Sequence, residues 1–184
     1  MTGVPHPRAL RRSIALIGLR GAGKSTVAKE LARLFGVGFI DTDDLVAAEA
    51  KRSIAAIFAD EGEAGFRQRE RRVIARLVDL PPAIFSVGGG AVLDSKNVRS
   101  LRSVADVVWL RAEPTVLWER VRDDPGTGSQ RPPLTDQPGL IEMQELAIQR
   151  RSYYEQAADL VVDTTNCEPP VIANQIAEAF GTKP

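Results

Sequence analysis

The chain is poor in cysteine, histidine and long apolar runs, which are features of other protein classes. Among its 184 residues there is one cysteine, Cys167, so no disulfide can form within the chain, and a reducing compartment such as the cytoplasm is expected. Its one histidine, His6, lies between prolines near the start, where a metal or catalytic role is not expected. No apolar run approaches the length that crosses a membrane. These shortages argue against a disulfide-rich, histidine-dependent or membrane-spanning protein.

An excess of one charge is also lacking. The 24 basic and 24 acidic residues cancel, which gives no support for nucleic acid or an anionic membrane surface as the main partner. Apolar residues make up 43% and charged residues 26% of the chain, as in ordinary globular proteins. We expect one domain over residues 1–184, with a tail over 1–12. We further expect a monomer that acts on small molecules.

What the sequence does have is a phosphate-binding motif near its start. Residues 18–25 read G-L-R-G-A-G-K-S, which fits G-x-x-x-x-G-K-[ST] at every fixed position. An apolar run over 14–17 precedes the motif, and apolar residues at helical spacing follow it from Val27. Strand, glycine loop and helix are the context that a nucleotide site requires. The expected nucleotide contacts are Gly21, Ala22, Gly23, Lys24, Ser25 and Thr26, with the Lys24 ammonium on the phosphates and the Ser25 hydroxyl on Mg²⁺.

The rest of the chain alternates between strand and helix patterns, which predicts an α/β fold. Further strands are expected over 37–40, 83–87, 104–110 and 160–162. Helices are expected over 45–50, from Ser53 as an N-cap, over 64–78, and over 94–102, 113–122, 140–158 and 170–180. This order predicts a parallel sheet between two layers of helices. Between them, residues 123–139 contain seven glycines or prolines, and we interpret this segment as a mobile active-site lid because too little chain follows for a second domain.

Two acids and three glycines follow predicted strands, where open α/β sheets bind ligands. Asp41 and Asp43 are two residues apart, so in extended chain both carboxylates point the same way, one toward Mg²⁺ and one toward a substrate hydroxyl. Capping of the next helix is the alternative. Gly88, Gly89 and Gly90 suggest close approach of the backbone to a ligand, or else a simple flexible turn.

Three arginines are candidate anion contacts. Arg150 shares a mostly apolar helical stripe with Met143 and Tyr154, so its guanidinium must meet an anion, which is either a substrate carboxylate or an internal acid. Arg67 is a weaker candidate, since Glu70 can pair with it on the helix surface. Arg131 lies in the predicted lid, from which it can reach a transferring phosphate.

With these motifs in order, the chain resembles the shikimate kinase family over nearly its whole length. The matching segments are G-L-R-G-A-G-K-S, D-T-D at 41–43, F-R-Q-R-E at 66–70, S-V-G-G-G-A at 86–91, Arg131-Pro132, Arg150 with Tyr154, and Val162-Asp163-Thr164 with Pro169. The resemblance implies a five-stranded parallel sheet of the nucleoside-monophosphate-kinase type. It also implies phosphorylation of the 3-hydroxyl of shikimate by ATP, which gives shikimate 3-phosphate and ADP in aromatic amino-acid biosynthesis.

The resemblance also assigns roles to residues. Asp43 would hold the reacting hydroxyl and accept its proton, while Asp41 would join Ser25 around Mg²⁺. Arg67 and Arg150 would clamp the carboxylate, with the backbone of 88–90 completing the pocket. Three more assignments are Arg131 on the γ-phosphate and Arg120 and Pro169 beside adenine. The lid departs from the family pattern, because it reads R-P-P-L over 131–134 and is lengthened by 125–129, and Ser152 stands where proline is usual.

Other functions compete with this one. The nearest alternative is a kinase that acts on a polyol acid such as gluconate. The triple glycine and the two separated arginines favour a shikimate-type pocket over it. A nucleoside-monophosphate kinase lacks support because no base-reading site is evident. A GTPase is disfavoured because the guanine-reading motif N-K-x-D is absent. A non-catalytic ligand sensor with a kinase fold would be expected to have lost Lys24, Asp43 or Arg131, and all three are present.

Overall fold

Five parallel strands form the centre of the molecule. The structure is a computed structural model that describes residues 9–124 and 139–181. Its strands are β1 (Ser13–Ile17), β2 (Phe39–Asp41), β3 (Ile84–Ser86), β4 (Ala105–Arg111) and β5 (Leu160–Asp163). They pair in the order β2-β3-β1-β4-β5, parallel throughout, which confirms the predicted five-stranded parallel sheet.

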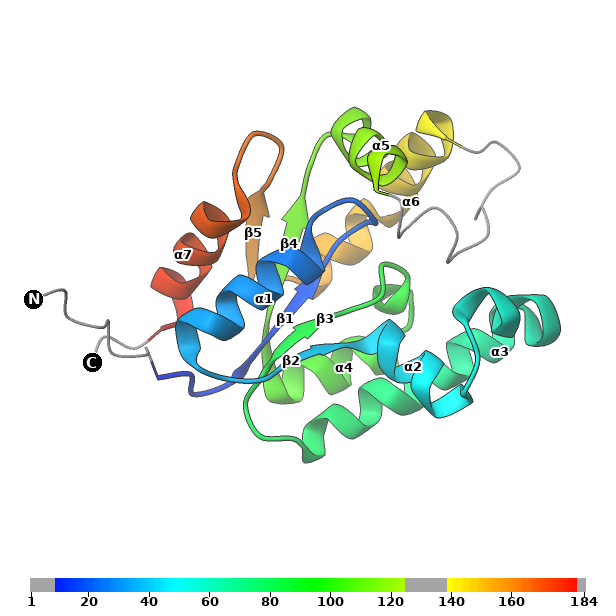
Figure 1. The fold of residues 1–184 in the computed structure, drawn as a ribbon, viewed down its shortest axis with the longest axis horizontal. Coiled ribbons are helices and arrows are strands. Elements are labelled where there is room, and N and C mark those ends of the chain that lie inside the picture. The colour runs from blue at the N-terminus through cyan, green and yellow to red at the C-terminus, as the bar shows by residue number, and fades with distance from the viewer. Residues whose placement is uncertain (1–8, 125–138, 182–184) are drawn as a thin grey trace, which may run out of the picture.

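Helices flank this sheet on both sides (Figure 1). Their bounds are α1 (Lys24–Phe35), α2 (Thr42–Ala50), α3 (Ile54–Arg76), α4 (Ser95–Val104), α5 (Pro114–Asp123), α6 (Leu140–Ala157) and α7 (Pro169–Phe180). Short 3₁₀ turns cover Leu77–Asp79 and Ala91–Leu93. Helices α1 and α7 pack together against one face, and α4 and α6 contact β4 from the other. The three-layer arrangement inferred from the alternating pattern is therefore confirmed.

The core lies along the central strand. Ile14, Leu16 and Ile17 of β1 are fully buried, because both faces of a parallel sheet are covered by helices and its strands can be apolar at every position. Trp109 of β4 is also buried. A second, smaller apolar cluster joins α2 to α3 and consists of Val46, Ile54, Ile57, Phe66 and Val73.

Local signals placed most helix ends correctly. The Ser53 side chain accepts a hydrogen bond from the Ala56 amide at 3.1 Å, so it is the predicted N-cap, and Pro114 occupies the first turn of α5. The two helices expected on either side of residue 62 form one element, α3, with a non-helical residue inside it: Gly62 has φ 65°, a conformation that glycine adopts without strain.

The segment after β2 differs from the prediction. Helix α2 begins at Thr42 rather than 45, so Asp41 ends the strand while Asp43 lies in the first helical turn. The expectation that both acids project from extended chain is wrong. The alternative, capping of the next helix, is confirmed for Asp41. Its Oδ1 accepts a hydrogen bond from the Asp43 amide at 3.0 Å and so satisfies a donor that the helix leaves free.

Parallel pairing brings the functional segments to one edge of the sheet. The phosphate loop follows β1, the two acids follow β2, and the glycines 88–90 follow β3, and these three strands are neighbours in the sheet. Figure 1 shows the three connections at the same end of the sheet. Most of the predicted lid, residues 125–138, lies outside the described residues.

Candidate active site

The phosphate loop is shaped by its glycines. Gly21 has φ 80° and Gly23 has φ 83°, in the region that L-residues with side chains rarely adopt. A Cβ at Gly21 would also collide with the carbonyl oxygen of Leu117. Gly23 is the N-cap of α1 and supplies no side-chain cap, so amide donors of the first turn remain available for an anion.

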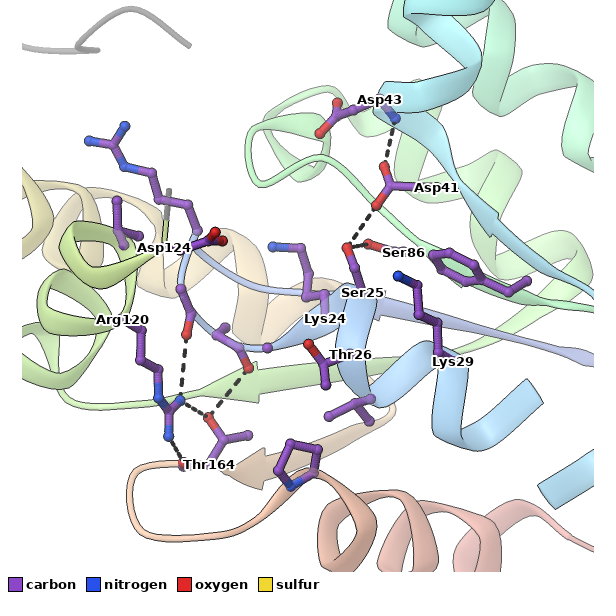
Figure 2. Close-up of a pocket in the computed structure, with 18 of the residues that line it drawn as sticks. Lys24, Ser25, Thr26, Lys29, Asp41, Asp43, Ser86, Arg120, Asp124 and Thr164 are labelled. Atoms are coloured by element: carbon purple, nitrogen blue, oxygen red, sulfur yellow. Dashed lines mark hydrogen bonds between the residues drawn. The ribbon is translucent and has the colours of Figure 1, made fainter. Parts of the chain in front are cut away.

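A cavity of about 790 Å³ opens in front of this loop. Figure 2 shows how side chains from α1, from the end of β2 and from α5 surround it. All eight residues assigned to the nucleotide from the sequence line it, namely Gly21, Ala22, Gly23, Lys24, Ser25, Thr26, Arg120 and Pro169. The structure thus brings the predicted nucleotide contacts into one space.

Lys24, the first residue of α1, reaches back along the loop. Its Nζ donates to the carbonyl oxygens of Gly18 at 2.9 Å and Leu19 at 3.0 Å, while the side chain lines the cavity. This places the ammonium group between the loop and the space in front of it, where a phosphate group would lie.

Oxygen donors gather beside the lysine. The Ser25 hydroxyl donates to Asp41 Oδ2 at 2.8 Å and lies 3.1 Å from the Ser86 hydroxyl (Figure 2). Beside a nucleotide, Mg²⁺ takes few ligands from the protein and completes its shell with phosphate oxygens and waters. The Asp41 carboxylate and the Ser25 hydroxyl, which already contact each other, are ligands of this kind. The donor set therefore fits Mg²⁺. Sequence reasoning missed Ser86, although the pairing of Asp41 with Ser86 in the β2–β3 register places it there.

A smaller pocket lies behind the phosphate loop, between α3, α6 and the glycines after β3. Its lining includes every residue assigned to the acid substrate from the sequence, that is Asp43, Arg67, Gly88, Gly89, Gly90 and Arg150, together with Glu70 and apolar side chains. It is a compact space with three arginines in its lining, because Arg20 joins Arg67 and Arg150 there.

Two of the three glycines, Gly88 and Gly90, make room for charged side chains of the site itself. A Cβ at Gly88 would lie 2.7 Å from Glu70 Oε1 and 2.9 Å from Asp43 Oδ1. A Cβ at Gly90 would collide with the Arg67 guanidinium. A side chain at Gly88 or Gly90 would therefore force these charged groups to shift. The close approach to this backbone comes from the protein's own side chains, an explanation that the sequence did not suggest.

Arg150 is held by that backbone. Its Nη1 donates to the Gly89 carbonyl oxygen at 3.2 Å, and the Tyr154 hydroxyl donates to the same oxygen at 2.5 Å. Arg150 is buried, and within residues 9–124 and 139–181 no carboxylate forms an ion pair with it. Burial raises the pKa of Tyr154 to about 12, so its hydroxyl remains a donor. A buried guanidinium held this way favours an external anion.

Arg67 does have internal partners. It pairs with Glu63 at 3.0 Å and with Glu70 at 2.9 Å, as the alternative interpretation allowed. Glu70 is only 1% exposed, however, so this pair lies in the pocket wall and not on the helix surface. Burial raises the pKa of the Glu70 carboxyl, and the nearby Arg67 opposes the rise. Glu70 was missed as a site residue, although it stands three positions after Arg67.

Arg120 joins two loops. Its guanidinium donates to the Thr164 carbonyl oxygen at 2.7 Å and reaches the Gly21 carbonyl oxygen at 3.4 Å. It therefore ties the phosphate loop to the segment after β5 (Figure 2). Arg131, the predicted γ-phosphate contact, lies outside the described residues.

Comparisons with known proteins point to one family. A family model described as Shikimate kinase matches residues 20–180. A shikimate kinase of Symbiobacterium thermophilum is 45% identical over 153 residues, which are 83% of this chain and 86% of that protein. A shikimate kinase of Neisseria meningitidis serogroup C is 41% identical over 158 residues, which are 86% of this chain and 91% of that protein.

Solved structures agree with these sequence matches. A shikimate kinase from Acinetobacter baumannii in complex with shikimate superposes with a TM-score of 0.85 at 30% identity and covers 91% of this chain and 92% of its own. A shikimate kinase from Aquifex aeolicus superposes with a TM-score of 0.76 at 31% identity, over 92% of this chain and 99% of its own.

Proposed function

The chain belongs to the shikimate kinase family, and from that premise we propose which of its residues carry the reaction. Shikimate kinases are transferases that use ATP to phosphorylate shikimate in aromatic amino-acid biosynthesis, and this is the activity of the protein. The observation that carries the assignment of residues is the meeting of two cavities, one against the phosphate loop and one lined by Arg67 and Arg150 among other residues.

The nucleotide occupies the larger cavity in this proposal. Amides of the phosphate loop and the Lys24 ammonium contact the phosphates, while Arg120 and Pro169 flank the adenine. Ser25 and Asp41 hold Mg²⁺, and Ser86 orients the Ser25 hydroxyl through the contact at 3.1 Å. The ion neutralises phosphate charge as it develops during transfer.

Shikimate occupies the smaller pocket. Its carboxylate binds the guanidinium groups of Arg67 and Arg150, which are planar donors suited to a carboxylate. The paired acids do not cancel this role, because Glu63 accepts two hydrogen bonds from Arg67 and Glu70 accepts one. These three bonds leave two of the five N–H donors of the guanidinium. Gly89 fixes Arg150 from behind through its carbonyl oxygen.

Asp43 lines both cavities, and this supports its assignment to the reacting hydroxyl. The 3-hydroxyl oxygen attacks the γ-phosphorus, the bond from that phosphorus to the β,γ-bridging oxygen breaks, and ADP leaves. The hydroxyl proton passes to the Asp43 carboxylate. Most of the acceleration comes from positioning and charge neutralisation, which is what this arrangement of loop, arginines and acid supplies.

Four expectations remain predictions. They are contact of Arg131 with the γ-phosphate, a single domain over 1–184 with a lid over 123–139, a monomeric state, and a cytoplasmic location. No helix among the described residues is long and apolar enough to cross a membrane.

A coupled assay of ADP release tests the proposal. With ATP and Mg²⁺, shikimate should be turned over and gluconate should not, and removal of Mg²⁺ by a chelator should abolish turnover. Turnover of gluconate in place of shikimate would reject the assigned acid pocket, and binding of shikimate without turnover would favour a ligand sensor.

A further inference from the structure

One further charged side chain stands where the two cavities meet. Among the described residues, only Asp43 and Arg20 line both the nucleotide cavity and the acid pocket. Asp43 already has a role at that boundary, as the acceptor of the hydroxyl proton. Arg20 is a cation at the same boundary, at a variable position of the phosphate-loop motif, so the motif itself says nothing about it.

A buried acid holds the Arg20 side chain. Its Nη2 donates to Glu142 Oε2 at 2.5 Å, and Glu142 is only 1% exposed. Glu142 lies in the first turn of α6, the helix that also presents Arg150 to the acid pocket. The ion pair therefore connects the loop that binds the phosphates to the helix that binds the acid substrate.

The pair leaves donors of Arg20 unused. The Arg20 Nε is buried and has no hydrogen-bond partner in the described part of the chain, and the side chain as a whole is 16% exposed. Burial of an ion pair is costly and adds little stability compared with apolar residues of similar size. A partly buried arginine whose buried Nε has no partner, beside two ligand cavities, is better explained by an anion that it meets there.

We propose that Arg20 stabilises the phosphoryl group during its transfer, and that Glu142 is a positioning residue that aims the Arg20 guanidinium at the junction of the cavities. The group in transfer carries negative charge on its equatorial oxygens, and fixed cationic donors at that point lower the barrier without having to reorganise. The inference rests on the proposed function, because it requires that ATP and shikimate meet at this junction.

Steady-state kinetics of Arg20→Met test the proposal. We expect kcat to fall by about 10- to 100-fold, as for other removed transition-state donors, while the KM values for ATP and shikimate change by less than about threefold. Arg20→Lys should recover part of the loss, because a positive charge remains. Added methylguanidinium should partly restore the kcat of Arg20→Met, an effect that a merely structural role would not give.

A double-mutant cycle tests the part assigned to Glu142. Glu142→Gln should lower kcat in the wild-type background but have no further effect once Arg20 is methionine, because a positioning residue acts only through its partner. Arg20→Met/Glu142→Gln also removes the buried Glu142 charge, whose loss of the Arg20 contact could destabilise Arg20→Met. Arg151→Met is the matched control: Arg151 forms an exposed pair with Glu155 on the same helix, and kcat should not change.

Two results would overturn the proposal. One is a kcat within about twofold of wild type for both Arg20→Met and the double variant. The other is additive losses for Arg20→Met and Glu142→Gln without rescue. The underlying function is tested separately by Asp43→Asn and Arg150→Ala, whose expected losses do not involve Arg20, so normal kinetics of Arg20→Met beside defective Asp43→Asn would reject this inference alone.

Discussion

At the scale of single residues, the site depends on a few charged side chains whose surroundings fix what each can do. Asp43 faces both cavities, Arg150 is held against a carbonyl oxygen, and Glu70 is buried beside Arg67. The residue types were visible in the sequence, but their partners were not. Glu70 and Ser86 went unnoticed because an acid on a helix and a serine in a strand carry no motif of their own.

The first prediction at this scale concerns the proton acceptor. Asp43→Asn should lower kcat by about 10²- to 10⁴-fold, since a general base typically contributes that much. The affinity for ATP should remain close to wild type, because the phosphates are held by the loop. Isothermal titration with a non-hydrolysable ATP analogue and a coupled assay measure the two effects. A kcat near the wild-type value would remove the role given to Asp43.

The second prediction concerns the acid clamp. Arg150→Ala should raise the KM for shikimate by about 30- to 1,000-fold, corresponding to about 2–4 kcal/mol for a buried charged contact. The KM for ATP should stay within about threefold. Arg151→Ala, one position along α6 and exposed, is the control and should behave as wild type. An unchanged KM for shikimate in Arg150→Ala would make Arg150 a purely structural residue.

The third prediction follows from the buried acid. Burial raises the pKa of Glu70 above its unfolded value near 4.5, so the folded protein binds the proton more tightly than the unfolded chain does. Glu70 therefore lowers stability progressively as the pH rises through its folded pKa. Urea unfolding at several pH values should show wild type losing free energy of unfolding relative to Glu70→Gln as the pH rises. A constant difference between the two proteins would contradict the assignment.

At the scale of elements, the connection after β3 and the start of α2 decide the geometry of the site. The sequence indicated that residues 88–90 matter, but not that Glu70, Asp43 and Arg67 would pack on them. The sequence also predicted extended chain at Asp43, whereas Asp41 caps a helix that begins at Thr42. A capping hydrogen bond links atoms two residues apart, and alternation of side chains in a strand does not reveal it.

Glycine replacement tests this connection. Gly90→Ala should raise the KM for shikimate, because its Cβ would displace the Arg67 guanidinium. The thermal unfolding temperature should stay close to that of wild type. Gly38→Ala is the matched control, since a Cβ there would meet nothing within 4 Å and its φ is not positive. Equal KM values for the two variants would show that Arg67 does not need its place against Gly90.

At the scale of the whole molecule, the sequence predicted the fold well. Alternating strand and helix patterns and an apolar central strand are local signals, and a parallel sheet with helices on both faces follows from them. Strand order and the division of one ligand edge into two cavities are not local, because they depend on which residues from distant segments meet. The pairing of Arg20 with Glu142, 122 positions apart, is of that kind.

The central claim is that ATP and shikimate meet over one edge of the sheet, at Asp43. The most direct measurement is a crystal structure of the protein with shikimate, Mg²⁺ and a non-hydrolysable ATP analogue. The account predicts the carboxylate of shikimate on the guanidinium groups of Arg67 and Arg150, with its 3-hydroxyl between Asp43 and the γ-phosphate. Shikimate bound elsewhere, with both arginines turned away from it, would contradict the account.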